Sequence, residues 1–316
     1  MAAASSHGPE GGRVVVTGGA GFIGSHVVDA FLEQGYEALV VDDLSTGLER
    51  NVPAGAAFER IDIVDGDVVE RAIFGFRPAA ICHLAAQSSV TVSVKTPERD
   101  LAVNVLGTLN VLEAARRAGA PVVFASTGGA LYGDRAPVPT PEDAVFEPLA
   151  PYGASKAAGE AYVGAWGRLH GIPNVVLRLG NVYGPRQRSD GEAGVVSIYS
   201  ERLRRGEAPV VFGDGKPTRD YVHVSDVARA FLLAAEGDRA GVFNVGTGFE
   251  STVLDLLAVL QEEAGTAVEP QPAPLRTGEL LRSALDASRI RDALGWSPKV
   301  ALRQGLVETY RALAGG

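Results

Sequence analysis

The sequence is poor in sulfur, with one cysteine and one methionine among its 316 residues, and it contains no long apolar run. A single cysteine excludes an intrachain disulfide. Without an apolar run of about 20 residues, a membrane-spanning helix is excluded and no membrane partner is expected. Residues 1–12 lack the basic start and the apolar stretch of a signal peptide. We therefore expect a disordered tail over 1–12 and a cytoplasmic protein.

The sequence also lacks a basic cluster, and its formal net charge is −9. A chain with this charge balance offers no electrostatic footprint for nucleic acid, so no nucleic-acid partner is expected. The five histidines are scattered without the spacing of metal ligands, and no metal site is predicted. The hydrophobic content of 46% and charged content of 21% are ordinary for a soluble globular enzyme.

A glycine motif near the N-terminus follows a short β-branched run, Val14-Val15-Val16, of the kind that forms a buried parallel strand. The motif contains Gly18, Gly21 and Gly24, and the stretch from Ser25 to Gln34 then reads as an amphipathic helix. Glycines at these positions allow a tight turn, a close approach of the backbone to a pyrophosphate and tight packing of helix on sheet. The phosphates would sit at the helix N-terminus, where free N–H groups favour anions.

A second predicted strand, 38–41, ends in Asp42-Asp43. This position lies about 20 residues beyond the glycines, where the acid that binds a dinucleotide ribose is expected. A carboxylate there disfavours the extra phosphate of NADP, and no arginine follows until Arg50. We therefore predict NAD as the cofactor.

Tyr152 and Lys156 lie four residues apart, so on a helix both side chains point into one cleft. A phenol is a poor base at its reference pKa near 10, but a nearby cation stabilises the phenolate and lowers that pKa. Such a pair can take a proton from an alcohol while a nicotinamide takes the hydride. Tyr152 is thus the predicted general base, and Lys156 is predicted to lower its pKa and to bind the nicotinamide ribose.

Apolar strands alternate with helical stretches along the first part of the chain. The predicted strands are 13–17, 37–41, 56–60, 79–84, 121–126 and 173–178. This alternation predicts an α/β fold with a Rossmann-type, doubly wound parallel sheet. After residue 178 the pattern breaks into segments rich in glycine and proline, which we interpret as a smaller, discontinuous C-terminal substrate lobe. The predicted division is 13–178 with 225–247 for the NAD-binding domain, and 179–224 with 248–316 for the lobe.

The chain resembles the extended short-chain dehydrogenase/reductase family and, within it, the NAD-dependent nucleotide-sugar epimerases. The resemblance runs from about Arg13 to the C-terminus. The matching motifs are Asp42 to Gly47, Asp62-Ile63, His83 to Gln87, Asn104, Ser126-Thr127, Tyr152 with Lys156, Arg178 to Pro185 and Arg219 to Val224. The resemblance also implies a homodimer formed through helices near 98–118 and 151–169.

The resemblance carries site residues over to matching positions of this sequence. The implied NAD-binding residues are Gly18, Gly21, Phe22, Ile23, Gly24, Asp42, Asp43, Ser45, Thr46, Gly47, Asp62, Ile63, Leu84, Ala85, Ala86, Gln87, Asn104, Tyr152 and Lys156. The implied substrate-binding residues are Ser88, Thr127, Asn181, Arg188, Val195, Val211, Phe212, Arg219, Arg276 and Glu279. Among the latter, Asn181, Arg219 and Arg276 would bind the nucleotide diphosphate. Glu279 would hold the ribose, and Val211 with Phe212 would pack the uracil.

The implied reaction oxidises C4 of a UDP-hexose and then returns the hydride to the other face. NAD is regenerated in each cycle and can stay tightly bound. One departure from the family concerns the hydroxyl that shuttles the proton, because its usual position is Gly128 here. We expect Thr127 to take this role, with Ser126 as the second choice.

Gly128-Gly129 also separates the reactions of the family. Related dehydratases carry an Asp-Glu pair directly after the threonine, and related decarboxylases usually keep a glutamate there. This chain offers neither an acid nor a base at these two positions. Return of the hydride is then the available exit, which favours an epimerase.

The identity of the sugar rests on Arg188. Epimerases of UDP-glucuronic acid often place an arginine at this position, facing the C6 carboxylate, and a guanidinium there has no obvious partner in a neutral sugar. Conversion of UDP-glucuronic acid to UDP-galacturonic acid is therefore favoured. The alternatives are a UDP-glucose/UDP-galactose 4-epimerase, a catalytically silent NAD-binding protein and a net oxidoreductase that releases NADH.

Overall fold

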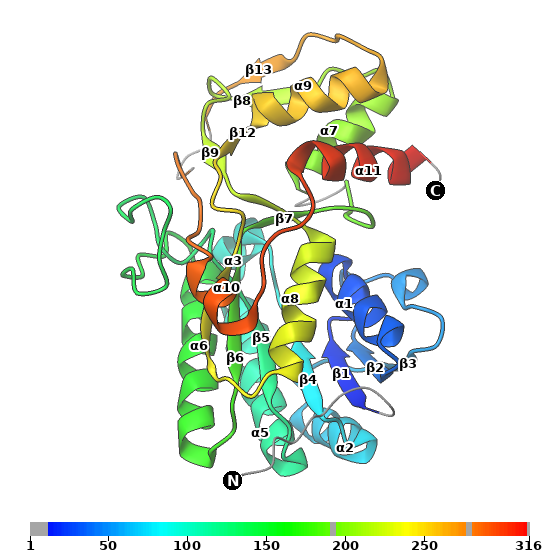
Figure 1. Cartoon of the computed structure of the whole chain (residues 1–316), viewed down its shortest axis with the longest axis vertical. Helices are drawn as coiled ribbons and strands as arrows, with labels where there is room; N and C mark the ends of the chain where they lie inside the picture. The colour runs from blue at the N-terminus through cyan, green and yellow to red at the C-terminus, as the bar shows by residue number, and fades with distance from the viewer. Residues whose placement is uncertain (1–11, 190–193, 276–279, 315–316) are drawn as a thin grey trace.

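The computed structural model of the protein describes residues 12–189, 194–275 and 280–314, and its centre is a parallel sheet (Figure 1). The strands of this sheet are β1 (Arg13–Thr17), β2 (Glu37–Asp42), β3 (Ala57–Arg60), β4 (Ala80–His83), β5 (Val122–Thr127), β6 (Val175–Leu179) and β11 (Gly241–Val245). Their order is β11-β6-β5-β4-β1-β2-β3, and all neighbours pair in parallel. The predicted Rossmann-type fold is confirmed, and each predicted strand lies within two residues of its expected bounds.

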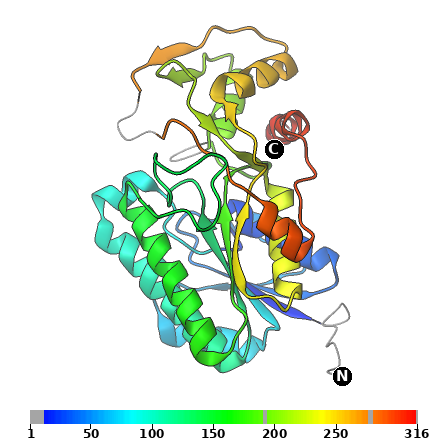
Figure 2. The ribbon, with the colours of Figure 1, turned by 60° about the vertical axis from the view of Figure 1, so that its left-hand side comes forward.

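Helices cover both faces of the sheet (Figure 2). They are α1 (Phe22–Glu33), α8 (Val224–Glu236) and α10 (Ser288–Leu294) on one face, and α2 (Gly66–Phe76), α5 (Thr108–Ala118) and α6 (Pro151–His170) on the other. The alternation of side chains along a strand explains the two layers. Val14 and Val16 of β1 pack with α1 and α8, whereas Val15 packs with α2 and α5. Strands buried on both faces must be apolar throughout, as the sequence is.

A smaller lobe stands beyond one edge of the sheet, at the top of Figure 1. Its elements are α7 (Val195–Arg204), β8 (Val210–Phe212), β9 (Thr218–Arg219), β12 (Ser251–Thr252), α9 (Val253–Ala264), β13 (Gln271–Ala273) and α11 (Leu302–Ala314). The lobe has a core of its own, in which Tyr199, Leu256 and Leu306 are buried. The paired strands β7 (Asn181–Tyr183) and β10 (Tyr221–His223) connect it to the sheet domain. Ile290 and Trp296 lie within the predicted lobe but pack on the sheet.

The predicted helix near 98–118 forms, but its hydrogen bonding changes from α to π over residues 102–107 while the backbone stays helical. The segment after β4 forms α3 (Val90–Lys95), α4 (Pro97–Leu101), a π-helical turn η2 (Ala102–Gly107) and then α5. Elsewhere, a turn of 3₁₀ helix, η1 (Glu49–Asn51), precedes β3. Single π turns inside helices occur frequently at functional sites. Within the described ranges, no helix combines the length and apolar character that crossing a bilayer requires.

Candidate active site

The predicted cofactor residues gather at the carboxyl edge of the sheet, because the ends of parallel strands meet there. The turn after β1 and the start of α1 supply Gly18, Gly21, Phe22, Ile23 and Gly24. The end of β2 and the loop after it supply Asp42, Asp43, Ser45, Thr46 and Gly47. The loop after β3 supplies Asp62 and Ile63, and the loop after β4 supplies Leu84, Ala85, Ala86 and Gln87. Asn104 reaches the same edge from η2, where its Oδ1 accepts from Gln87 N at 2.9 Å. Ser126 and Thr127 end β5, and Tyr152 and Lys156 lie in the first turns of α6.

The glycine loop fits a dinucleotide pyrophosphate. Gly18 has φ +73°, and a Cβ there would lie 2.6 Å from Ala85 N. A Cβ on Gly24 would lie 2.1 Å from Gly18 O, so helix α1 can approach the turn only with glycine at this position. The N-terminus of α1 has no side-chain cap and no acidic residue in its first turn. Its first N–H groups therefore suit an anion.

Asp42 fits a ribose of the same cofactor. Its Oδ2 accepts from Ala20 N at 3.0 Å and its Oδ1 from Leu44 N at 2.8 Å, which fixes the carboxylate at the end of β2. Each oxygen retains capacity for another donor, such as a ribose hydroxyl. Burial raises the pKa of Asp42, while these two backbone hydrogen bonds lower it. A Cβ on Gly47 would lie 2.7 Å from Asp42 Oδ1, so the glycine keeps this side of the carboxylate open.

Thr127, the first choice for the proton relay, lies close enough to Tyr152 for its side chain to lower the pKa of the phenol. Burial and the negative charge of Asp100 act in the opposite direction and raise this pKa to about 12. The expected lowering of the pKa by Lys156 is not seen in the chain alone, where burial is the largest cause. Lys156 Nζ instead donates to Ala125 O at 2.8 Å and lies 4.7 Å from the centre of the Phe124 ring.

Burial lowers the pKa of Lys156 to about 8, while the charges of Asp100 and Glu160 act to raise it. The ammonium form is thus retained at neutral pH with only a narrow margin. Buried His83, in the neighbouring strand β4, has its pKa lowered to about 3 by burial and by the charge of Lys156. His83 is therefore neutral, and it bonds to the hydroxyls of Thr17 at 2.7 Å and Thr108 at 3.0 Å.

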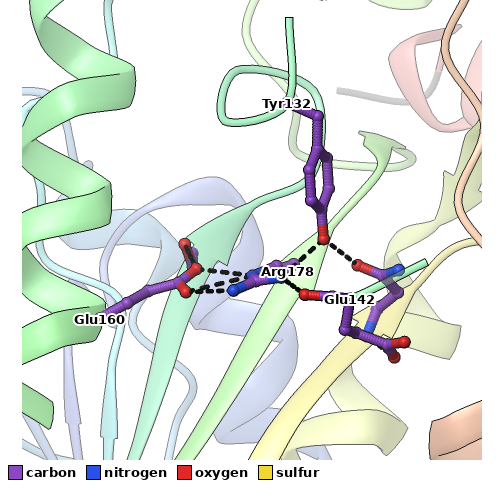
Figure 3. A network of polar contacts seen from close by, with 6 residues as sticks. Tyr132, Glu142, Glu160 and Arg178 are labelled. Atoms are coloured by element: carbon purple, nitrogen blue, oxygen red, sulfur yellow. Dashed lines mark hydrogen bonds and ion pairs between the residues drawn. The ribbon is translucent and has the colours of Figure 1, made fainter. Parts of the chain in front are cut away.

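Ser126 points away from Tyr152 toward a buried ion pair. Its hydroxyl donates to Glu160 Oε1 at 2.5 Å, and Arg178 Nη2 binds Glu160 Oε2 at 2.7 Å. Figure 3 shows Arg178 between Glu160 on one side and Tyr132 and Glu142 on the other. Arg178 Nη1 donates to the Tyr132 hydroxyl and to the Glu142 carbonyl oxygen, each at 2.7 Å. This network ties α6 and β6 to the loop after Gly128-Gly129.

Gly128 is in close contact with the C-terminal segment. A Cβ on Gly128 would lie 2.5 Å from Leu285 Cδ1, so the side chain of Leu285 occupies the space that a serine or threonine would need. Leu285 N donates to Asp220 Oδ2 at 3.1 Å, which holds this segment in place. On the other side of the loop, a Cβ on Gly129 would lie 3.7 Å from Asn181 Oδ1. The glycine pair thus lies between Leu285 and a predicted substrate residue.

The predicted substrate residues lie on both lobes. Asn181 is in β7, Val195 begins α7, Val211 and Phe212 are in β8, Arg219 is in β9, and Ser88 is exposed before α3. A cavity of about 430 Å³ beside β8 is lined by Gly213, Asp214, Lys216, Pro217, Leu275, Leu281 and Arg282. Arg219 Nη1 donates to Leu280 O at 2.8 Å. Arg276 and Glu279 lie outside the described residues.

Arg188 contacts the cofactor loop. Its Nη1 donates to Thr46 O at 3.3 Å. The preceding residues of the segment contact α1, where His26 Nε2 lies 2.9 Å from Pro185 O and Arg186 pairs with Asp29. In this arrangement the segment lies against the cofactor side of the cleft, and the contact with Thr46 gives no support to a role at C6 of a sugar.

Three charged residues near the catalytic helix were not singled out as site residues from the sequence. They are Asp100, Glu160 and Arg178, all of them buried. The sequence spacing could have indicated two of them. Glu160 lies four residues after Lys156, and Asp100 lies four residues before Asn104, so each pair shares one face of a helix. No spacing of this kind indicates a role for Arg178, because its partners are far from it in the sequence. They are Glu160 of α6 and, in the loop after β5, Tyr132 and Glu142.

A Rossmann-type sheet with this glycine loop and a Tyr–Lys pair at its carboxyl edge defines an NAD-dependent enzyme of the short-chain dehydrogenase/reductase type. Comparison with known proteins makes the assignment narrower. Residues 14–246 match the family described as the NAD dependent epimerase/dehydratase family. The chain belongs to this family, and NAD is its cofactor.

Individual relatives match this chain over nearly its whole length. A UDP-glucose 4-epimerase of Mycolicibacterium smegmatis is 44% identical over 94% of this chain and 97% of its own. The crystal structure of UDP-glucose 4-epimerase of Thermotoga maritima with UDP-glucose has a TM-score of 0.93 at 46% identity, covering 96% of this chain and 99% of that one. The UDP-glucose 4-epimerase of Thermus thermophilus in complex with NAD gives 0.90 at 47% identity, with the same coverage.

Proposed function

We propose that this protein interconverts UDP-glucose and UDP-galactose by NAD-dependent inversion at C4. The observation that carries the proposal is the grouping of Tyr152, Thr127 and the buried Lys156 at the edge of the sheet where the cofactor loops meet, with the Thr127 side chain acting on the pKa of Tyr152. This arrangement offers a proton acceptor and a relay to one alcohol of a bound sugar.

In this proposal Tyr152 and Thr127 transfer the proton, and Lys156 supplies a positive charge beside them. When bound, NAD supplies a reversible hydride acceptor that is positively charged in its oxidised form. Positive charge favours the phenolate of Tyr152, whose pKa is too high in the chain alone. Tyr152 then takes the proton of the sugar 4-hydroxyl through Thr127, and returns it when C4 is reduced from its other face. Lys156 keeps a positive charge in the same helix turn.

Elimination and decarboxylation would need a further acid or base close to the sugar. Gly128 and Gly129 occupy the positions where related enzymes carry carboxylates, and both lack a side chain. The buried carboxylate of Glu160 is bound to Arg178 and Ser126, which removes it from such a role. A 4-keto sugar held here is therefore expected to be reduced rather than to lose a group.

The sugar is proposed from the relatives and from Arg188. The relatives that are 44% and 46% identical are named UDP-glucose 4-epimerases, which favours the alternative over the preference for UDP-glucuronic acid drawn from the sequence. UDP-glucuronic acid stays a second candidate, because Arg188 is an exposed cation beside Thr46 of the cofactor loop, and a guanidinium suits a carboxylate.

The test is a comparison of substrates. The purified protein is incubated separately with UDP-glucose and UDP-glucuronic acid, and the products are identified by NMR. We expect UDP-galactose from the first and a rate at least tenfold lower with the second. A fast conversion of UDP-glucuronic acid beside a negligible rate with UDP-glucose would reverse the proposal on the sugar. An Arg188→Ala variant distinguishes the two candidate substrates, because the substitution is expected to lower the rate of conversion of UDP-glucuronic acid and to leave the rate with UDP-glucose unchanged.

We also propose a homodimer formed through the outer surface of α3 to α6. Val94, Leu101 and Leu169 are each more than 60% exposed there, and Tyr162 is 38% exposed. Figure 2 shows α5 and α6 side by side on the outside of the sheet, where a second copy can pack helix on helix. Light scattering at micromolar concentration is expected to give the dimer mass, and a Leu101→Glu variant the monomer mass. A monomeric wild-type protein would contradict the proposal.

A further inference from the structure

Asp100 is a buried carboxylate in α4, 1% exposed, that the proposed reaction does not use. Its Oδ1 accepts from two neutral amides, Gln87 Nε2 at 2.8 Å and Asn104 Nδ2 at 3.1 Å. In the part of the chain that the structure describes, no ion pair includes Asp100. A buried charge without a counter-ion is costly, so its presence needs a reason other than stability.

Hydrogen bonds connect Asp100 to the catalytic helix. Asn104, which binds Asp100, also donates from Nδ2 to Ser155 Oγ at 3.0 Å, and the Ser155 hydroxyl donates to Tyr152 O at 3.0 Å. Asn104 lies in the π-helical turn η2, and both α4 and η2 pack against α6. A chain of contacts therefore leads from Asp100 to the turn of α6 that carries Tyr152 and Lys156.

We propose that Asp100 is a positioning residue that supplies the fixed negative charge keeping buried Lys156 an ammonium, a role that rests on the proposed epimerase chemistry. The π turn places Asn104 so that the carboxylate is held by amides alone and its charge is not neutralised. Asp100 then acts through Lys156 without contact with substrate.

The other charged groups around Lys156 do not serve this purpose as well. Glu160, one turn later in α6, shares its charge with Arg178 of β6 through a bidentate contact. His83 of β4 is neutral, since burial and Lys156 lower its pKa to about 3. Tyr152 is a neutral phenol in the chain alone. The charge of Asp100 raises the pKa of both Lys156 and Tyr152. Asp100 is thus the unpaired anion of this group.

The chain offers a direct measurement, because it contains four lysines, Lys95, Lys156, Lys216 and Lys299. Three of them are exposed and only Lys156 is buried. In protein labelled with carbon-13 at the lysine Cε, the shift of each signal during a pH titration reports one ammonium group. A Lys156→Arg variant identifies the signal of Lys156. Its midpoint in the wild type is expected near pH 8.

The informative variant is Asp100→Asn, which keeps the shape and an acceptor oxygen for both amides but removes the charge. The midpoint of Lys156 is expected to fall by on the order of one pH unit, the size of shift that a nearby charge of opposite sign produces. The matched control is Glu98→Gln, which removes one exposed charge from the same helix and is expected to leave the midpoint unchanged. Asp100→Ser removes the charge with a smaller side chain if the first variant does not fold.

Turnover gives the second readout. In Asp100→Asn the acid and alkaline limbs of the kcat–pH profile are both expected to move to lower pH, because the charge of Asp100 raises both pKa values. A purely structural role would lower kcat at every pH without moving the limbs. An unchanged Lys156 midpoint in the folded variant would overturn the inference even if the wild type is an epimerase. Absence of epimerisation by the wild type would instead refute the proposed function, while the NMR titration still decides the role of Asp100.

Discussion

The roles of Thr127 and Ser126 can be separated by one pair of substitutions. The two residues are adjacent at the end of β5, and each carries a hydroxyl. Their surroundings differ, because the Thr127 side chain acts on the pKa of Tyr152 while Ser126 donates to Glu160 Oε1 at 2.5 Å. Thr127→Val and Ser126→Ala each remove one hydroxyl and change little else. The structure predicts opposite consequences for turnover and for stability.

The expected magnitudes follow from these contacts. Loss of a positioned proton relay lowers turnover by about 100-fold or more, and we expect this of Thr127→Val, with little change in stability. Ser126→Ala removes a hydrogen bond to a carboxylate that is 6% exposed in a buried ion pair, which costs about 1–3 kcal/mol of the free energy of unfolding. Its turnover is expected to stay within about threefold of the wild type, because the hydroxyl of Ser126 donates to Glu160.

The assay starts from UDP-galactose and couples the formation of UDP-glucose to UDP-glucose dehydrogenase, so that NADH absorbance reports turnover. Stability is measured by urea unfolding of the same preparations. The reasoning is refuted if Ser126→Ala loses turnover as strongly as Thr127→Val while remaining folded. Unchanged turnover in Thr127→Val would remove Thr127 from the proton path.

Three further substitutions test the cofactor loop, the buried ion pair and the glycine pair. In Gly24→Ala the added methyl group would lie 2.1 Å from a carbonyl oxygen of the same loop, so the purified protein is expected to contain less NAD, measured by mass spectrometry after acid release. Arg178→Met leaves Glu160 buried without its counter-ion and is expected to lower the free energy of unfolding by about 3–5 kcal/mol in urea; a loss below about 1 kcal/mol would contradict this. Gly128→Ser crowds the Leu285 side chain and is expected to lower the free energy of unfolding by about 1–3 kcal/mol. Adding Leu285→Ala to this variant should restore part of the lost stability, as measured by thermal unfolding.

The sequence was sufficient for features that depend on local pattern. Runs such as Val14 to Val16 are apolar on both faces, which only a sheet covered on two sides explains. The strand bounds follow for the same reason. Gly24 is required by a contact within the turn itself, since a Cβ there would meet Gly18 O, whereas Gly18 has φ +73° and also approaches Ala85 of the loop after β4.

Features that depend on contacts between distant segments could not be predicted. The direction of the Ser126 hydroxyl is decided by Glu160 and Arg178, and the space at Gly128 by Leu285, which comes from far along the chain. The π turn replaces the α-type hydrogen bonds in the middle of a helix whose sequence has ordinary helical periodicity. The pKa of Tyr152 rises mainly because the phenol is buried, and burial depends on the whole fold.

The central claim is that the protein inverts C4 by removing a hydride and returning the same hydride. The most direct measurement is an incubation with UDP-glucose in deuterated water, followed by proton NMR of the products. The account predicts formation of UDP-galactose with hydrogen, not deuterium, at C4, and no formation by a Tyr152→Phe variant. Deuterium at C4, release of NADH in proportion to substrate, or absence of UDP-galactose even after addition of NAD would contradict it.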